Sequence, residues 1–299
     1  MVKNIINIFL FIVILQANVP AAFKDFGWGA RAAGMGGAFS AVADDASAPF
    51  YNPAGIGRVP GLETMFMHSM PYFGMTGVDV ALNMASIIVP VQGNVVGVNW
   101  SNLTSAEQYS ENIFALTYSR LVNEKLFAGI NLKYLGHSYT IEAGFDDPVF
   151  DLSETGVYGY DVDVGFLFCM TNMFCIGGMF KNMLGTDMGL YDSDELQKEV
   201  RGGAALHVTE NLTLAMDVDY RGTRAEFFAG VETWFSDRKF GARAGTNYRD
   251  QSVHEITAGA SYRQLFGSSS FVTLDYSFSL PLTVSGTFTT HRFAVSLGL

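Results

Sequence analysis

Apolar and polar side chains alternate along most of this 299-residue chain. Between residues 212 and 220 every second position is apolar or aromatic, from Leu212 to Tyr220, and Asp217 is among the polar residues between them. The same alternation recurs at residues 272–278 and 293–299. A period of two predicts β-strands that have one apolar face and one polar or small face.

Fourteen segments of the chain fit this period. They are residues 62–73, 79–91, 95–103, 112–120, 125–139, 158–169, 174–183, 198–208, 212–221, 226–235, 239–248, 254–264, 270–280 and 287–299. Short connections are expected at 92–94, 121–124, 171–173, 209–211, 236–238 and 265–269, and the others at 101–111, 140–157, 184–197 and, somewhat shorter, 281–286. An even number of strands, with short turns at one end and longer loops at the other, is typical of an outer-membrane barrel. We therefore predict an all-β fold, a fourteen-stranded antiparallel transmembrane β-barrel over residues 62–299.

The N-terminus has the features of an export signal. Lys3 precedes an apolar run over residues 5–15, and small residues follow up to Ala22. This order is typical of a secretory signal peptide, with cleavage expected between Ala17 and Ala22. The chain then divides into a signal peptide (1–22), a short N-terminal segment with a short helix (23–61) and the barrel (62–299).

The composition agrees with a barrel in a membrane. Hydrophobic residues make up 49% of the chain and charged residues only 16%, against about 25% charged in typical globular domains. The low Pro and Cys contents exclude disorder, collagen and a disulfide scaffold, and a net charge of −11 argues against a nucleic-acid partner. The mean hydropathy is +0.21, yet no run approaches the ~20 apolar residues of a spanning helix. In a closed barrel, alternate side chains face lipid while the backbone pairs within the wall.

Several side chains have special positions in the expected barrel. The aromatic residues near strand ends fit interfacial girdles in contact with outer-membrane lipids: Tyr72, Trp100, Tyr118, Tyr134, Tyr220, Tyr248 and Tyr262. The charged residues of inward parity are Asp161, Asp163, Lys181, Arg201, Asp217, Asp219, Glu232, Arg243, Arg263, Asp275 and Arg292. Because both signs occur, we expect them to pair and leave the lumen mostly blocked, since a narrow lumen does not tolerate unpaired charges. A polar conduit is the alternative.

Three motifs follow the signal peptide in order: G-A-R-A-A-G-M-G-G-A from Gly29, A-D-D-A-S from Ala43, and N-P-A-G from Asn52. This stretch resembles the start of the FadL superfamily of outer-membrane proteins, most of all its PorV/PorQ-like branch. The resemblance implies that the segment lies inside the barrel as a plug or lateral-gate element; simple filling of the lumen is the alternative. The plug and gate residues so implied are Gly34, Gly36, Gly37, Asp44, Asp45, Asn52, Pro53 and Ala54.

Local chemistry fits that segment. Its small residues allow close backbone approach. Asp44 or Asp45 is suited to cap a short helix, and Asn52 before Pro53 is expected to end it. A phosphate-binding loop is excluded, because the chain has no G-x-x-x-x-G-K-[ST] motif.

Two functions follow from the resemblance. The first is FadL-like passive transport of hydrophobic or small molecules along a path past Phe39, Phe50 and Asn52. The alternative is a PorV-like docking or shuttle component of a type IX-like secretion system, with secreted protein as cargo. The hydrophobic terminal residue Leu299 is typical of chains inserted by the barrel-assembly machinery.

Other candidate chemistry has a simple interpretation. The acidic stretch holding Glu142, Asp146, Asp147, Asp151, Glu154, Asp161 and Asp163 lacks EF-hand spacing and is typical of a solvated outer loop. Cys169 and Cys175 flank a turn and form either a cross-strand disulfide or two free buried thiols. The histidines fall on separate strands, and no G-x-S-x-G motif occurs: His68, His137, His207, His254 and His291. We expect no enzyme, metal site or cofactor.

Overall fold

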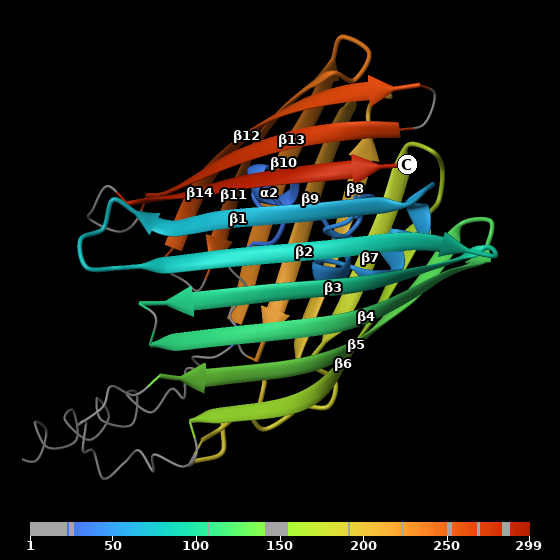
Figure 1. The fold of residues 1–299 in the computed structure, drawn as a ribbon. Helices are drawn as coiled ribbons and strands as arrows, with labels where there is room; N and C mark the ends of the chain where they lie inside the picture. The colour runs from blue at the N-terminus through green and yellow to red at the C-terminus, as the bar shows by residue number, and fades with distance from the viewer. Residues whose placement is uncertain are drawn as a thin grey trace, which may run out of the picture.

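The alternating segments form fourteen antiparallel strands that close into a barrel in the computed structural model (Figure 1). The structure describes residues 23, 27–106, 108–140, 155–190, 192–222, 224–249, 253–267, 270–282 and 288–299. Each strand pairs with its neighbours in sequence, and β1 pairs with β14 to complete the ring. The predicted fold class is therefore confirmed, whereas the predicted signal peptide lies outside the described residues.

The strands vary in length. Their bounds are β1 Glu63–Phe73, β2 Val80–Val91, β3 Asn94–Ser105, β4 Tyr109–Asn123, β5 Leu126–Tyr139, β6 Gly156–Cys169, β7 Phe174–Lys181, β8 Glu199–His207, β9 Leu212–Arg221, β10 Arg224–Phe235, β11 Phe240–Arg249, β12 Val253–Phe266, β13 Ser270–Pro281 and β14 Thr289–Gly298. We call the end with the even-to-odd connections the turn end and the opposite end the loop end. All fourteen expected strands are present.

One expected loop is a strand pairing instead. The sequence predicts a long connection over residues 101–111, but β3 and β4 pair as far as Ser105 and Tyr109. The polar side chains of Asn102 and Asn112 lie on the outer face of these strands and bond to each other at 3.2 Å. Polar residues on the face expected to be apolar hid the strand period here.

The two faces of the wall differ as the alternation predicts. On β9, Leu214, Met216 and Val218 are 42%, 68% and 44% exposed, while Asp217 between them is buried. The tyrosines expected in girdles are exposed, and Trp100 is half-buried. No helix among the described residues is long and apolar enough to cross a membrane.

The stretch before β1, residues 27–61, lies inside the ring of strands, and we call it the inner segment (blue in Figure 1). It contains the α-helix α2 (Ala30–Gly34) and the 3-10 helices η1 (Ala48–Phe50) and η2 (Pro53–Arg58). Helix α2 packs on β11–β14, and η2 packs on β3–β6. The single short helix that the sequence predicts is thus three short helices.

The ring closes between the first strand and the last. β1 and β14 pair from Glu63 opposite Gly298, with a register shift between Met70 and Phe73. Beyond the ladder, the N–H of Leu299 donates to the carbonyl oxygen of Leu62 at 2.8 Å. The inner segment therefore leads directly into the strand that completes the wall.

Candidate functional site

The inner segment lies directly on the backbone of the wall. Gly36 has φ +70°, and a Cβ there would lie 2.6 Å from the carbonyl oxygen of Thr246 and 2.8 Å from that of Ala229. On the wall side, a Cβ on Gly245 would overlap the backbone of Met35 and Gly36. Glycines on both partners thus allow this close approach.

The other end of the inner segment also lies against glycines of the wall. A Cβ on Gly165 would overlap the side chain of Asn52, and one on Gly129 would overlap the backbone of Pro53 and Ala54. Gly177 leaves room for the carbonyl of Ser40. The predicted plug residues are therefore seated in the wall at both ends of the segment.

Arg31 joins the inner segment to the wall by charge. Its guanidinium donates twice to Glu232, at 2.7 Å each, and contacts Asp44 at 2.5 Å and Asp45 at 3.1 Å. Burial alone would lower the pKa of Arg31, but Asp44 and Glu232 outweigh it and hold that pKa well above its ordinary value. Burial likewise acts to raise the pKa of Asp44, yet Arg31 and Arg58 hold it below the ordinary value.

The ion pairs continue along the wall. Glu232 also accepts from Arg243 at 2.6 Å, and Arg243 lies 3.3 Å from Asp275. All three of these side chains are buried. Opposite charges thus alternate from the inner segment to β13, as expected for charges in a narrow lumen.

A second cluster holds the middle of the inner segment. The carboxylate of Asp217 accepts from Phe39 N–H at 3.0 Å and from Ser40 N–H at 2.9 Å. Arg201 pairs with Asp217 at 3.1 Å and donates to the carbonyl of Gly37. Asp219 lies farther away, 4.0 Å from Arg201. Buried wall charges thus bind backbone groups of the inner segment.

Two further predicted lumen cations, Arg263 and Arg292, contact neutral groups. Arg263 lies 4.6 Å from the ring centre of Trp234 and donates to the Thr273 hydroxyl at 3.0 Å. Arg292 donates to the Ser279 hydroxyl at 2.9 Å and to the carbonyl of Gly27 at 3.2 Å. The lumen is lined by these side chains but is occupied by the inner segment.

The expected roles of Asp44 and Asp45 in helix capping are wrong. Helix η1 begins after Ser47, which makes no side-chain cap bond. Asp45 instead accepts from Ser47 N–H at 2.8 Å, which closes the turn ahead of η1. Asp44 is used for the pair with Arg31.

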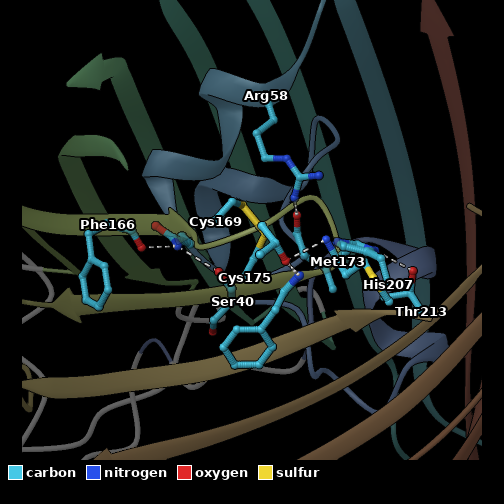
Figure 2. The surroundings of a disulfide bond; sticks show 12 residues. Ser40, Arg58, Phe166, Cys169, Met173, Cys175, His207 and Thr213 are labelled. Carbon is cyan, nitrogen blue, oxygen red and sulfur yellow. Dashed lines mark hydrogen bonds between the residues drawn. A yellow bond between two sulfur atoms is a disulfide. The ribbon is translucent and has the colours of Figure 1, made fainter. Parts of the chain in front are cut away.

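Asn52 is the helix cap that the structure does have. It follows η1 and caps η2 by accepting from Ala54 N–H at 3.1 Å. Its amide nitrogen donates to the carbonyl oxygens of Ser40 and Phe166, each at 2.8 Å (Figure 2). Cys169 and Cys175 lie nearby, directly opposite each other on β6 and β7, and are joined by a disulfide.

The acidic stretch does not form one unit. Residues 141–154 lie outside the described residues. Asp161 and Asp163 belong to β6, where both are buried and face inward. The expectation that these two carboxylates are part of a solvated loop is therefore wrong.

A cavity of about 80 Å³ lies between the inner segment and the loop end of the wall. Its floor is aromatic, because the rings of Trp28 and Phe50 lie 5.1 Å apart. Leu103, Leu135 and Met179 supply apolar wall. An engineered cavity of roughly 150 Å³ binds benzene, so this one accepts a ligand ring only after some widening.

Five of the six charged side chains around the cavity form ion pairs, and the sixth, Glu111, accepts from the Tyr109 hydroxyl at 2.7 Å and from the Phe23 N–H at 3.0 Å. Lys133 lies 2.6 Å from Asp163, and Lys181 lies 2.9 Å from Glu199, which also pairs with Arg221. The cavity therefore combines apolar and aromatic surface with polar groups that are mostly engaged with one another.

Some of these residues were not singled out from the sequence. Arg31 stands alone among small residues of the inner segment, which was a usable signal. Ser101 is buried at the cavity, and its hydroxyl has no hydrogen-bond partner among the described residues. The alternation of the sequence places Lys133, Glu199 and Ser101 on the inward face, but it does not predict which side chains they contact.

The comparisons with known proteins give the fold. No protein-family model matches the chain, and no curated protein sequence matches it. The toluene transporter TbuX of Ralstonia pickettii is 11% identical, with a TM-score of 0.65, over 91% of this chain and 97% of that one. The toluene transporter TodX of Pseudomonas putida is 13% identical, with a TM-score of 0.65, over 92% and 98%. A Pseudomonas aeruginosa FadL homologue is 12% identical, with a TM-score of 0.64, over 89% and 96%.

These likenesses define the class of fold. The chain is a closed, fourteen-stranded antiparallel β-barrel with the architecture of those proteins. At such low identity, a shared fold does not assign the substrates of those proteins to this chain. Function has to be argued from the lumen and the cavity.

Proposed function

We propose that this protein is an outer-membrane channel for the passive uptake of small apolar molecules. The cavity carries the proposal, since it places aromatic and apolar surface at the loop end of a barrel whose outer face is apolar. The similar structures, by their titles transporters of toluene and a FadL homologue, support the same class of cargo.

The inner segment is the element that closes the path in this proposal. It is buried against the wall, and its contacts with Glu232, Asp217 and Phe166 come from different parts of the ring. A wide water-filled conduit does not fit such filling, because the lumen charges bind each other or the inner segment. We do not propose the secretion-docking alternative, which the similar structures do not support.

Uptake by intact cells tests the proposal. The host is a Gram-negative strain deleted for its own channel of this kind, and the probes are radiolabelled toluene and radiolabelled palmitate. Cells that make the full chain should take up at least one probe several-fold faster than cells with an empty vector. Equal rates, with the protein shown in the outer membrane by its altered gel mobility when unboiled, would refute the proposal.

A variant links uptake to the cavity. Leu103→Trp adds bulk at a cavity-lining position, so uptake should fall about tenfold if the cavity lies on the path. Leu103→Ile keeps the side-chain volume and serves as the matched control. Equal loss in both variants, or in neither, would place the path elsewhere.

A further inference from the structure

The turn end of the lumen gathers guanidinium groups around one tryptophan. Trp234, near the end of β10, is buried. The guanidinium carbons of Arg238, Arg243 and Arg263 lie 5.5, 5.2 and 4.6 Å from the centre of its ring. We call these four residues the turn-end cluster. Guanidinium groups gathered around one ring repel one another, and an anion beside them would relieve that repulsion.

The turn-end cluster has more cations than carboxylate partners. Arg243 pairs with Glu232 and with Asp275. In the part of the chain that the structure describes, no carboxylate forms an ion pair with Arg238 or Arg263, although the whole chain has a net charge of −11. Two guanidinium groups of the cluster are thus available to an anion from outside.

Two hydrogen-bond donors of the cluster also lack an acceptor. Trp234 Nε1 and Arg243 Nη2 are both buried, and neither has a hydrogen-bond partner among the described residues. A buried donor without an acceptor is destabilising. Excess positive charge and unmatched N–H groups at one place are the features of a site for a carboxylate or a similar oxyanion.

A second cavity lies next to the cluster, and we call it the turn-end cavity. Its volume is about 150 Å³, and it is lined by residues 59–63, Phe271, Gly298 and Leu299. An engineered apolar cavity of roughly this volume binds benzene. The ring of Phe271 belongs to both places, because the guanidinium carbon of Arg263 lies 4.8 Å from its centre. A benzene-sized space and an available cation therefore share one aromatic side chain.

The lining of the turn-end cavity orients a charged ligand. Val59, Pro60 and Leu62 supply apolar surface, whereas Glu63 is a carboxylate that accepts from the N–H of Ala46 at 2.9 Å. Glu63 repels an anion, so the charged end of a ligand is expected at the turn-end cluster and its apolar part in the cavity.

We propose that the turn end of the lumen binds a small aromatic carboxylate, with its ring in the turn-end cavity beside Phe271 and its carboxylate on Arg263 and Arg238. The planar guanidinium group donates two parallel hydrogen bonds to a carboxylate, which a solvated ring alone cannot receive. This site lies at the opposite end of the lumen from the cavity of Trp28 and Phe50. Binding there does not require the uptake function.

Ligand titrations of the purified full chain in detergent test the site. Trp28→Phe/Trp100→Phe leaves Trp234 as the only tryptophan, so its fluorescence reports on the turn-end cluster. Benzoate is the probe, acetate supplies the carboxylate without the ring, and toluene supplies the ring without the charge, all at constant ionic strength. Benzoate should change the fluorescence saturably and bind at least tenfold more tightly than acetate or toluene. No binding of benzoate, or an equal affinity for either of the other two, would overturn the proposal.

A charge variant tests the cluster in the same background. Arg263→Gln should weaken benzoate binding at least tenfold, because the charge-assisted hydrogen bonds are lost. Arg120→Gln is the matched control, since Arg120 is an exposed cation near the turn end of β4, and it should change the affinity less than twofold. Equal weakening by both variants would show a response to overall charge and overturn the site.

A cavity variant tests the place of the ring without a change in charge. Leu62→Phe narrows the turn-end cavity, so benzoate binding should fall at least tenfold while acetate binding stays the same. Leu62→Ile keeps the side-chain volume and should bind benzoate as before. Each variant is first shown to be a folded barrel by its altered gel mobility when unboiled. Equal benzoate affinity in Leu62→Phe and Leu62→Ile would overturn the placement of the ring.

Discussion

Gly36→Ala tests the docking of the inner segment on the wall. The new methyl group would lie 2.6 Å from the Thr246 carbonyl oxygen and 2.8 Å from that of Ala229. Both atoms belong to paired strands, so they cannot move aside as a flexible side chain would. The residue also has φ +70°, which disfavours any side chain.

The expected magnitude has two parts. A left-handed backbone costs a non-glycine residue about 1–2 kcal/mol, and overpacking costs about 1–3 kcal/mol. Gly36→Ala should therefore lower the free energy of unfolding by about 2–5 kcal/mol. Gly93→Ala is the control that separates the two contributions. Gly93 has φ +81°, but no other atom lies within 4 Å of the place its methyl group would take. This variant should therefore show only the cost of the left-handed backbone.

Two measurements read out the effect. Denaturant titration of the folded barrel in detergent gives the free energy of unfolding of each variant. Trypsin cleavage after Arg31 shows whether the inner segment is docked, since Arg31 is buried in the intact protein. Cleavage is expected in Gly36→Ala but not in Gly93→Ala. Equal destabilisation by both variants, with trypsin resistance kept, would show that the segment does not lie on the strand backbone.

Three further outcomes follow from the contacts of the inner segment. Asn52→Ala leaves the carbonyls that Asn52 serves without a donor and should cost about 1–3 kcal/mol of stability by denaturant titration, whereas a loss under ~0.5 kcal/mol would contradict its role. Replacing Cys169 and Cys175 by Ser frees a short loop in the unfolded chain and should cost about 2 kcal/mol, seen as a lower denaturant midpoint; an unchanged midpoint would show that the disulfide does not form. Because Arg31 and Arg58 lower the folded pKa of Asp44, its contribution is present above its unfolded pKa of about 3.9 and is lost as the pH falls below that value. Stability of the wild type between about pH 5 and about pH 2.5 should therefore fall more steeply than that of Asp44→Asn, and parallel curves would contradict the pairing.

The strand pattern was readable from the sequence because the two faces of this wall meet different surroundings. Lipid-side positions such as Met216 are apolar, while inward positions such as Asp217 are polar or small. Where outer-face positions are polar, as at Asn102 and Asn112, the pattern fails, and the sequence predicts a loop in place of a strand pairing. The period reports the environment of a face, not the hydrogen bonding of the backbone.

Only part of the candidate site could be predicted from the sequence. Parity placed Glu232, Arg243 and Asp275 on the inner face, but it did not show that Arg31 of the inner segment completes their chain of pairs. Contacts across the lumen depend on the stagger of the ring and on where the inner segment lies. Neither is encoded in local alternation. The course of the connection from β7 to β8 along β6 could not be predicted either, since it depends on the length of β7 relative to β6.

The seam between β1 and β14 has a consequence for the order of assembly. It joins Glu63 to Gly298, almost the full length of the barrel sequence, so its pairing has the largest loop to close. The inner segment contacts β3–β6 through η2 and β11–β14 through α2, and it thereby offers both halves of the chain a common surface while the ring is still open. We therefore expect the inner segment, which precedes β1, to be the surface around which the pairing of β1 with β14 forms.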